Sequence, residues 1–125
     1  MGETVVKIKV SNLTDKKSTD VEVLVDSGAT YTTIPEPILQ KLGIEVVDKI
    51  TIELADGRLI ERNIGNAIVE VEGKVRSTPI LFGQEGDATI MGLVTLEACG
   101  LTVDTVNRKL VPLLKIHHYR LFFTR

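Results

Sequence analysis

Residues 23–30 read Val-Leu-Val-Asp-Ser-Gly-Ala-Thr, and this stretch determines both the predicted fold and the predicted site. The β-branched and apolar residues at its start predict a buried strand. Asp26 follows that strand directly, and Ser27 and Gly28 favour a tight turn. We therefore expect a carboxylate in a buried setting, beside a turn that offers it backbone N–H donors.

A second motif, Thr89-Ile90-Met91-Gly92, joins an apolar pair to a glycine and opens a helical pattern over residues 93–99. Between the two motifs, residues 49–60 predict a β-hairpin. Apolar and polar residues alternate along its first strand, and Asp56-Gly57 is a typical hairpin turn. The sequence thus predicts two apolar elements separated by a projecting hairpin.

Short apolar runs separated by turn residues predict an all-β domain with one or two short helices. The expected strands are residues 5–10, 20–25, 31–34, 46–54, 59–71, 74–82, 90–91, 101–104 and 109–112, and the expected helices are residues 35–42 and 93–99. Gly65 interrupts the longest run, which predicts a bulge or bend there. Tyr31 is expected to pack in the core.

Length and composition fit a single domain that spans residues 1–125. Hydrophobic residues make up 43% of the chain and aromatic residues only 4%, so the predicted core consists of Val, Ile and Leu. The net charge is −2 with both signs mixed, which indicates neither a nucleic-acid nor a membrane partner. No apolar run is long enough to span a bilayer, and we expect a cytoplasmic protein.

Cys99 is the only cysteine, so neither an intramolecular disulfide nor a Cys-based metal site can form. It lies in an apolar helical stretch, and we expect a buried structural thiol. His117 and His118 are the only histidines, and adjacent residues of a strand point to opposite faces. We therefore expect no metal site and no cofactor.

An Asp-Ser/Thr-Gly triplet after an apolar strand, followed later by an apolar-apolar-Gly element, resembles the retropepsin-like aspartic proteases. The resemblance covers about residues 5–113. It implies a closed acid-protease barrel whose flap is the hairpin at 49–60, with Asp26 as the catalytic residue and Ser27 and Gly28 as its support. The residues that it places against the substrate are Ala29, Thr30, Ala55, Asp56, Gly57 and Ile90.

The chain has one Asp-Ser-Gly triplet, whereas peptide hydrolysis by carboxylates needs two carboxyl groups. Two close carboxyl groups share one proton, so one activates a water molecule and the other donates to the amide carbonyl. The sequence therefore predicts a homodimeric aspartic endopeptidase in which each subunit contributes Asp26, acting on a peptide or protein substrate. The apolar C-terminal tail, residues 114–125, is a candidate for the dimer interface.

Two positions depart from the viral members of the family. Viral enzymes commonly carry an Asp after the Asp-Ser/Thr-Gly-Ala run and an Arg after the apolar-apolar-Gly element, and these residues pair in the dimer. Here the positions hold Thr30 and Leu93, so the chain resembles the cellular or prokaryotic branch. Two alternatives stay open: a non-catalytic dimeric module that binds peptides, and a subunit or fragment of a larger assembly.

Overall fold

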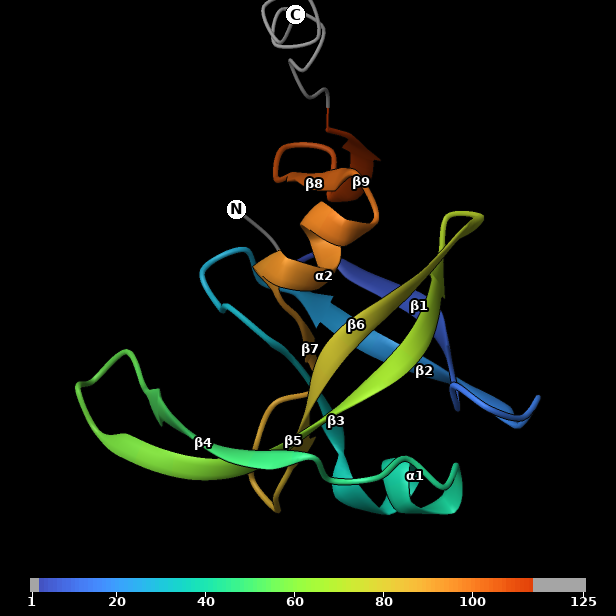
Figure 1. Cartoon of the computed structure of the whole chain (residues 1–125). Coiled ribbons are helices and arrows are strands. Elements are labelled where there is room, and N and C mark those ends of the chain that lie inside the picture. The colour runs from blue at the N-terminus through green and yellow to red at the C-terminus, as the bar shows by residue number, and fades with distance from the viewer. Residues whose placement is uncertain (1–2, 114–125) are drawn as a thin grey trace, which may run out of the picture.

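The computed structural model describes residues 3–113 (Figure 1). Its elements, in chain order, are β1 (Val5–Ser11), β2 (Ser18–Val25), β3 (Thr32–Pro35), α1 (Glu36–Lys41), β4 (Asp48–Glu53), β5 (Leu59–Val71), β6 (Lys74–Gly83), β7 (Ile90–Met91), α2 (Leu93–Ala98), β8 (Leu101–Asp104) and β9 (Lys109–Pro112). None of the helices in this part of the chain is long and apolar enough to cross a membrane. The predictions for the tail at 114–125 and for its histidines lie outside the described residues.

The strands form a sheet that closes on itself. Its order is β1-β2-β7-β3-β6-β5-β4, and β1 also pairs with β5, so all of its strands except β4 form a closed ring. β4 pairs only with β5, and the two form the hairpin that projects from the barrel (Figure 1). The predicted all-β fold with a flap hairpin and two short helices is therefore confirmed. β8 and β9 form a separate small hairpin after α2.

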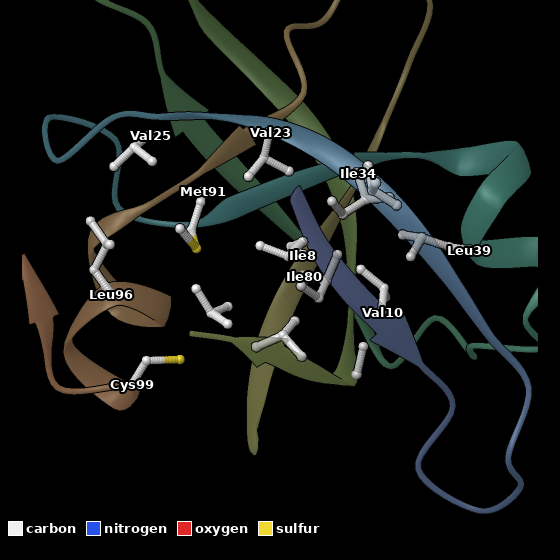
Figure 2. Packing of buried hydrophobic residues seen from close by; sticks show 14 of the residues in the cluster. Ile8, Val10, Val23, Val25, Ile34, Leu39, Ile80, Met91, Leu96 and Cys99 are labelled. Atoms are coloured by element: carbon white, nitrogen blue, oxygen red, sulfur yellow. The ribbon is translucent and has the colours of Figure 1, made fainter. Parts of the chain in front are cut away.

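Alternating residues of the strands point into the barrel and form its core (Figure 2). Ile8 and Val10 of β1 and Val23 of β2 are almost fully buried. Their neighbours Lys9 and Glu22, which point the other way, are exposed. Each fully buried aliphatic side chain stabilises the fold by about 1.5–3 kcal/mol. Leu96 and Cys99 extend this core toward α2, so the prediction of a buried thiol is confirmed.

Three of the buried threonines are linked through their hydroxyl groups, and we call them the threonine cluster: Thr32, Thr78 and Thr95. The Oγ1 atom of Thr95 lies 2.6 Å from that of Thr32 and 2.8 Å from that of Thr78. These residues belong to α2, β3 and β6, so hydrogen bonds link the helix to two strands of the barrel. Buried hydroxyls are costly unless they are paired, and in this cluster each one has a partner.

Of the bulge or bend predicted at Gly65, the bulge does not occur. β5 pairs with β6 in an unbroken register from Ile64 opposite Leu81 to Val71 opposite Lys74, and Gly65 lies opposite Ile80. A Cβ atom on Gly65 would overlap the carbonyl oxygen of Glu45 and crowd the ring of Phe82. The glycine thus allows the chain before β4 to cross close to β5, a tertiary contact that the local sequence does not encode.

Candidate active site

The Asp26 turn is fixed by backbone hydrogen bonds to β7 on one side and to the residue before β1 on the other. β2 runs parallel to β7, with Val25 opposite Met91. At the end of this pairing the Asp26 N–H donates to the Met91 carbonyl at 3.0 Å, and the Val25 N–H donates to the Thr4 carbonyl at 2.8 Å. The two sequence motifs therefore lie side by side, and the place where the turn leaves the barrel is set by the second motif.

The loop after Asp26 is held by its own turn and by the start of α2. The Ala29 N–H donates to the Asp26 carbonyl at 3.1 Å, and the Gly28 N–H donates to Asp26 Oδ1 at 2.9 Å. The N–H groups of Leu93 and Val94 then donate to the carbonyls of Ala29 and Thr30, at 2.8 and 3.0 Å. The expected backbone donor to the carboxylate is thus present, and both ends of the loop are anchored.

Gly92 explains why the second motif ends in a glycine. A Cβ atom at this position would lie 2.5 Å from the Tyr31 carbonyl oxygen and 2.9 Å from that of Ala29. The Gly92 N–H also donates to Thr32 Oγ1 at 3.0 Å, which connects the motif to the threonine cluster. Backbone packs directly on backbone here, so the loop that carries Asp26 has no room to shift toward α2.

A cleft of about 530 Å³ separates the Asp26 loop from the β4–β5 hairpin. The loop and the hairpin lie on the same side of the barrel, with the hairpin projecting from it (Figure 1). Six of the predicted site residues line the cleft, and they are Asp26, Gly28, Ala29, Thr30, Ala55 and Ile90. The structure therefore brings the two motifs and the end of β4 together around one cavity.

Three of the predicted site residues do not line this cleft. They are Ser27, which is exposed on the Asp26 turn, and Asp56 and Gly57 at the tip of the hairpin. Asp56 instead accepts hydrogen bonds from the backbone N–H and Nε of Arg58, and this pairing holds the pKa of the Asp56 carboxyl below its usual range. Gly57 has φ +88°, a left-handed conformation that fits the predicted turn.

Two expectations about burial are wrong. The Asp26 side chain is exposed in the single chain, because the turn carries it beyond the end of the buried strand. Tyr31 lines the cleft and is only half-buried, so it does not pack in the core. Both side chains lie on the loop between β2 and β3, where the inward and outward alternation of a strand no longer applies.

Sequence reasoning missed an ion pair in the wall of the cleft. Nε and Nη2 of Arg62 donate to the two carboxylate oxygens of Asp87 at 2.7 and 2.9 Å, and both residues line the cleft. The hydrogen bond from Arg62 lowers the pKa of Asp87, and the same bond raises the pKa of Arg62. No local pattern could have identified this pair, because the barrel brings together two residues that are far apart in the sequence.

The other missed residues come from the hairpin, from β3 and β6, and from the loop before β7. They are Thr33, Thr51, Ile52, Glu53, Leu54, Ile60, Leu81 and Ala88. The alternating pattern at 49–60 could have indicated those on β4 and β5. Among residues 3–113, no group of three or more His, Cys, Asp or Glu side chains is arranged to hold a metal ion.

A carboxylate on an anchored Asp-Ser-Gly turn, with a projecting hairpin on the other side of a cleft, is the arrangement of an aspartyl protease domain. The family model described as gag-polyprotein putative aspartyl protease matches residues 14–98, which is more than half of the chain. The chain belongs to this family of retropepsin-like aspartyl protease domains. No match was found among curated proteins.

Proposed function

We propose that this protein is a homodimeric aspartic endopeptidase with one Asp26 from each subunit in its active site. The observation that supports this most strongly is the combination of the family match with a single carboxylate on an anchored turn at the cleft. Asp26 is the only carboxylate on that turn, and the reaction needs two. A two-fold axis near Asp26 supplies the second one.

In this dimer the two Asp26 carboxyl groups share a proton. The ionised carboxylate takes a proton from a water molecule, which attacks the amide carbonyl, and the protonated carboxyl donates to the carbonyl oxygen. The exposure of Asp26 in the single chain is consistent with this role, because the partner subunit then provides the burial. Ser27, exposed on the same turn, is available for a hydrogen bond across the axis.

The substrate occupies the cleft, which the apolar residues Ile52, Leu54 and Ile90 line together with the polar turn. The hairpin covers it, and the tip residues Asp56 and Gly57 contact it once the hairpin closes. The proposal treats residues 1–125 as one protease domain. It also places the enzyme in the cytoplasm, as expected from the sequence.

Leu93 supports a dimer interface different from that of the viral enzymes. It follows the apolar-apolar-Gly motif, its N–H donates to the Ala29 carbonyl, and the residue is 40% exposed although its side chain is large and apolar. Thr30, at the position of the viral Asp, is exposed on the Asp26 loop, and its carbonyl accepts the N–H of Val94, the residue after Leu93. We propose that Leu93 makes an apolar contact across the axis in place of the viral ion pair.

The experiment compares cleavage of a denatured protein by the wild type, by Asp26→Asn and by Asp20→Asn. Asn is nearly isosteric with Asp but cannot act as the base, so Asp26→Asn abolishes cleavage. Asp20→Asn makes the same chemical change at an exposed position of β2, the strand that leads to Asp26, and retains the wild-type rate. A statine-type inhibitor, which mimics the tetrahedral intermediate, stops the wild type.

Two results contradict this proposal. Cleavage by Asp26→Asn at the wild-type rate would exclude Asp26 as the catalytic group. A wild type that binds the denatured protein but does not cleave it, at any pH between 3 and 8, would instead identify a non-catalytic peptide-binding module.

A further inference from the structure

Among the residues that the structure describes, the Arg62–Asp87 ion pair is the only side-chain hydrogen-bonded link between the hairpin and the barrel. Within residues 3–113, every other side-chain hydrogen bond of residues 48–63 is local to the hairpin. The two side chains are 18% and 22% exposed, so the pair is largely shielded from solvent. A bidentate pair between a guanidinium and a carboxylate fixes orientation as well as distance.

The pair lies where the hairpin leaves the barrel. β5 pairs with β6 from Val71 only as far as Ile64, and from that point toward the tip β5 pairs with β4 alone. Arg62 is therefore two residues beyond the last barrel pairing. A two-stranded hairpin has little stability of its own, so a link at this point determines how the whole hairpin is oriented.

Asp87 is itself fixed within the loop between β6 and β7. Its Oδ2 accepts the Gln84 N–H at 2.7 Å, and its own N–H donates to the Gln84 carbonyl at 2.9 Å. Ala88 and Ile90, just after Asp87, line the cleft opposite the hairpin. A carboxylate held in this way ties the base of the hairpin to the opposite wall of the cleft.

A second Arg–Asp pair on the same hairpin provides the contrast. At the tip, Nε of Arg58 lies 2.8 Å from Oδ2 of Asp56, but the two side chains are 72% and 56% exposed. This pair joins residues of one turn and connects the hairpin to nothing else. Exposed pairs of this kind contribute little to stability, whereas a shielded bidentate pair between distant segments contributes more.

We propose that Arg62 and Asp87 are positioning residues that hold the base of the hairpin against the loop before Ile90 and so set the width of the substrate cleft. The inference rests on the proposed function in one respect, namely that the hairpin covers a substrate. Loss of the pair lets the hairpin swing away from Asp26, which weakens substrate binding. The chemistry at Asp26 is untouched, because the Asp26 loop is anchored by other bonds.

The test is a double-mutant cycle with Arg62→Gln, Asp87→Asn and the double variant, and with Arg58→Gln as the matched control. Amide hydrogen exchange over residues 48–63 is measured for each without substrate. We expect each single variant to exchange about 5- to 30-fold faster there, and the double variant to exchange no faster than the single ones. Arg58→Gln changes exchange at residues 54–58 only.

Kinetics with a peptide substrate provide the second readout. The KM of Arg62→Gln and of Asp87→Asn rises by about the same factor as the exchange rate, while kcat stays within about twofold of the wild type. Arg62→Lys keeps the charge but not the bidentate geometry, and we expect it to lie between the wild type and Arg62→Gln in both readouts.

Hydrogen exchange needs no activity, so the two proposals can fail separately. An inactive wild type whose single variants still loosen the hairpin contradicts the proposed function and supports the positioning role. Unchanged exchange over residues 48–63 in both single variants overturns the positioning role, whatever the activity. Faster exchange in an active enzyme with an unchanged KM shows that the pair holds the hairpin but does not set the cleft, which also overturns the inference.

Discussion

The Asp26 loop and the β4–β5 hairpin line the same cleft but are held in place by opposite means. Backbone hydrogen bonds from Asp26, Leu93 and Val94 anchor the loop, and the threonine cluster lies beneath it. Within the described part of the chain, the hairpin beyond Ile64 is held by one shielded ion pair to the barrel and by its own β4–β5 pairing. The loop can therefore move only if backbone hydrogen bonds break, whereas the hairpin can move once a single ion pair is lost.

The rigid loop positions the reacting carboxylate, and the loosely held hairpin controls how the substrate enters the cleft. A reacting carboxylate must stay within a fraction of an ångström of its productive position, which favours bonds that no side-chain rotation can release. A cover must open and close, which favours a segment with few contacts to the rest of the fold. Substitutions that affect one wall and not the other test this division.

The largest expected effect comes from adding one methyl group to Gly92. In Gly92→Ala the new Cβ meets the carbonyls of Tyr31 and Ala29, which cannot move without breaking the loop anchors. We expect the free energy of unfolding to fall by about 3 kcal/mol or more and cleavage to be lost. Urea unfolding measures the loss, and a variant as stable as the wild type would show that the loop is not held by this packing.

Gly57→Val is the corresponding change in the hairpin. Its φ of +88° disfavours a β-branched residue, but a Cβ atom there meets no other atom within 4 Å. We expect a loss of only about 1–2 kcal/mol in unfolding free energy, with a larger proportional loss in kcat/KM because the turn at the tip is altered. A loss as large as that of Gly92→Ala would contradict the distinction between the two walls.

Thr95→Val tests the threonine cluster beneath the Asp26 loop. Val fills nearly the same volume but removes the hydroxyl that joins Thr32 to Thr78. We expect the free energy of unfolding to fall by about 1–3 kcal/mol, because buried hydroxyl groups lose their partner. Thr102→Val, at a half-exposed position of β8, is the control and changes stability by about 0.5 kcal/mol or less.

Leu93→Arg tests the proposed apolar contact of Leu93 with the second subunit. In the proposed dimer it places two like charges near the two-fold axis without acidic partners, so we expect the dissociation constant of the dimer to rise about tenfold or more. Analytical ultracentrifugation measures this constant. The double variant Thr30→Asp with Leu93→Arg restores the viral ion pair and part of the affinity, and a monomeric wild type that retains activity would contradict the dimer.

The smallest expected effect is a loosening of the hairpin at acid pH. Arg62 and the Gln84 N–H hold the pKa of folded Asp87 below its ordinary value of 3.8. The contribution of the pair to stability is therefore complete above that ordinary value and is lost as pH falls through the lowered pKa. Exchange over residues 48–63, relative to β2, rises in that range in the wild type but not in Asp87→Asn.

The sequence predicted well those parts of the molecule that depend on local patterns. Alternation located the strands, and the Asp-Ser-Gly and Ile-Met-Gly motifs located the two elements that meet at the cleft. What it could not predict depends on closure of the barrel. The Arg62–Asp87 pair, the threonine cluster and the contact of Gly65 with Glu45 all join segments whose proximity is set only by the tertiary fold.

The predictions that Asp26 and Tyr31 are buried were wrong for a related reason. The apolar run before Asp26 is buried as expected, but strand periodicity stops where the turn begins, so it gives no information on Asp26 or Tyr31. A single chain also lacks the surface that a second subunit would cover.

The most direct test of the central claim, that two subunits share one active site, is the activity of a mixture. Wild type and Asp26→Asn are mixed in equal amounts under conditions that allow subunits to exchange, and cleavage is compared with the same total concentration of wild type. If both Asp26 carboxyl groups are needed, only dimers of two wild-type subunits are active, and the mixture retains about a quarter of the activity. Retention of half the activity after full exchange would mean that each chain works alone, and the shared site would have to be abandoned.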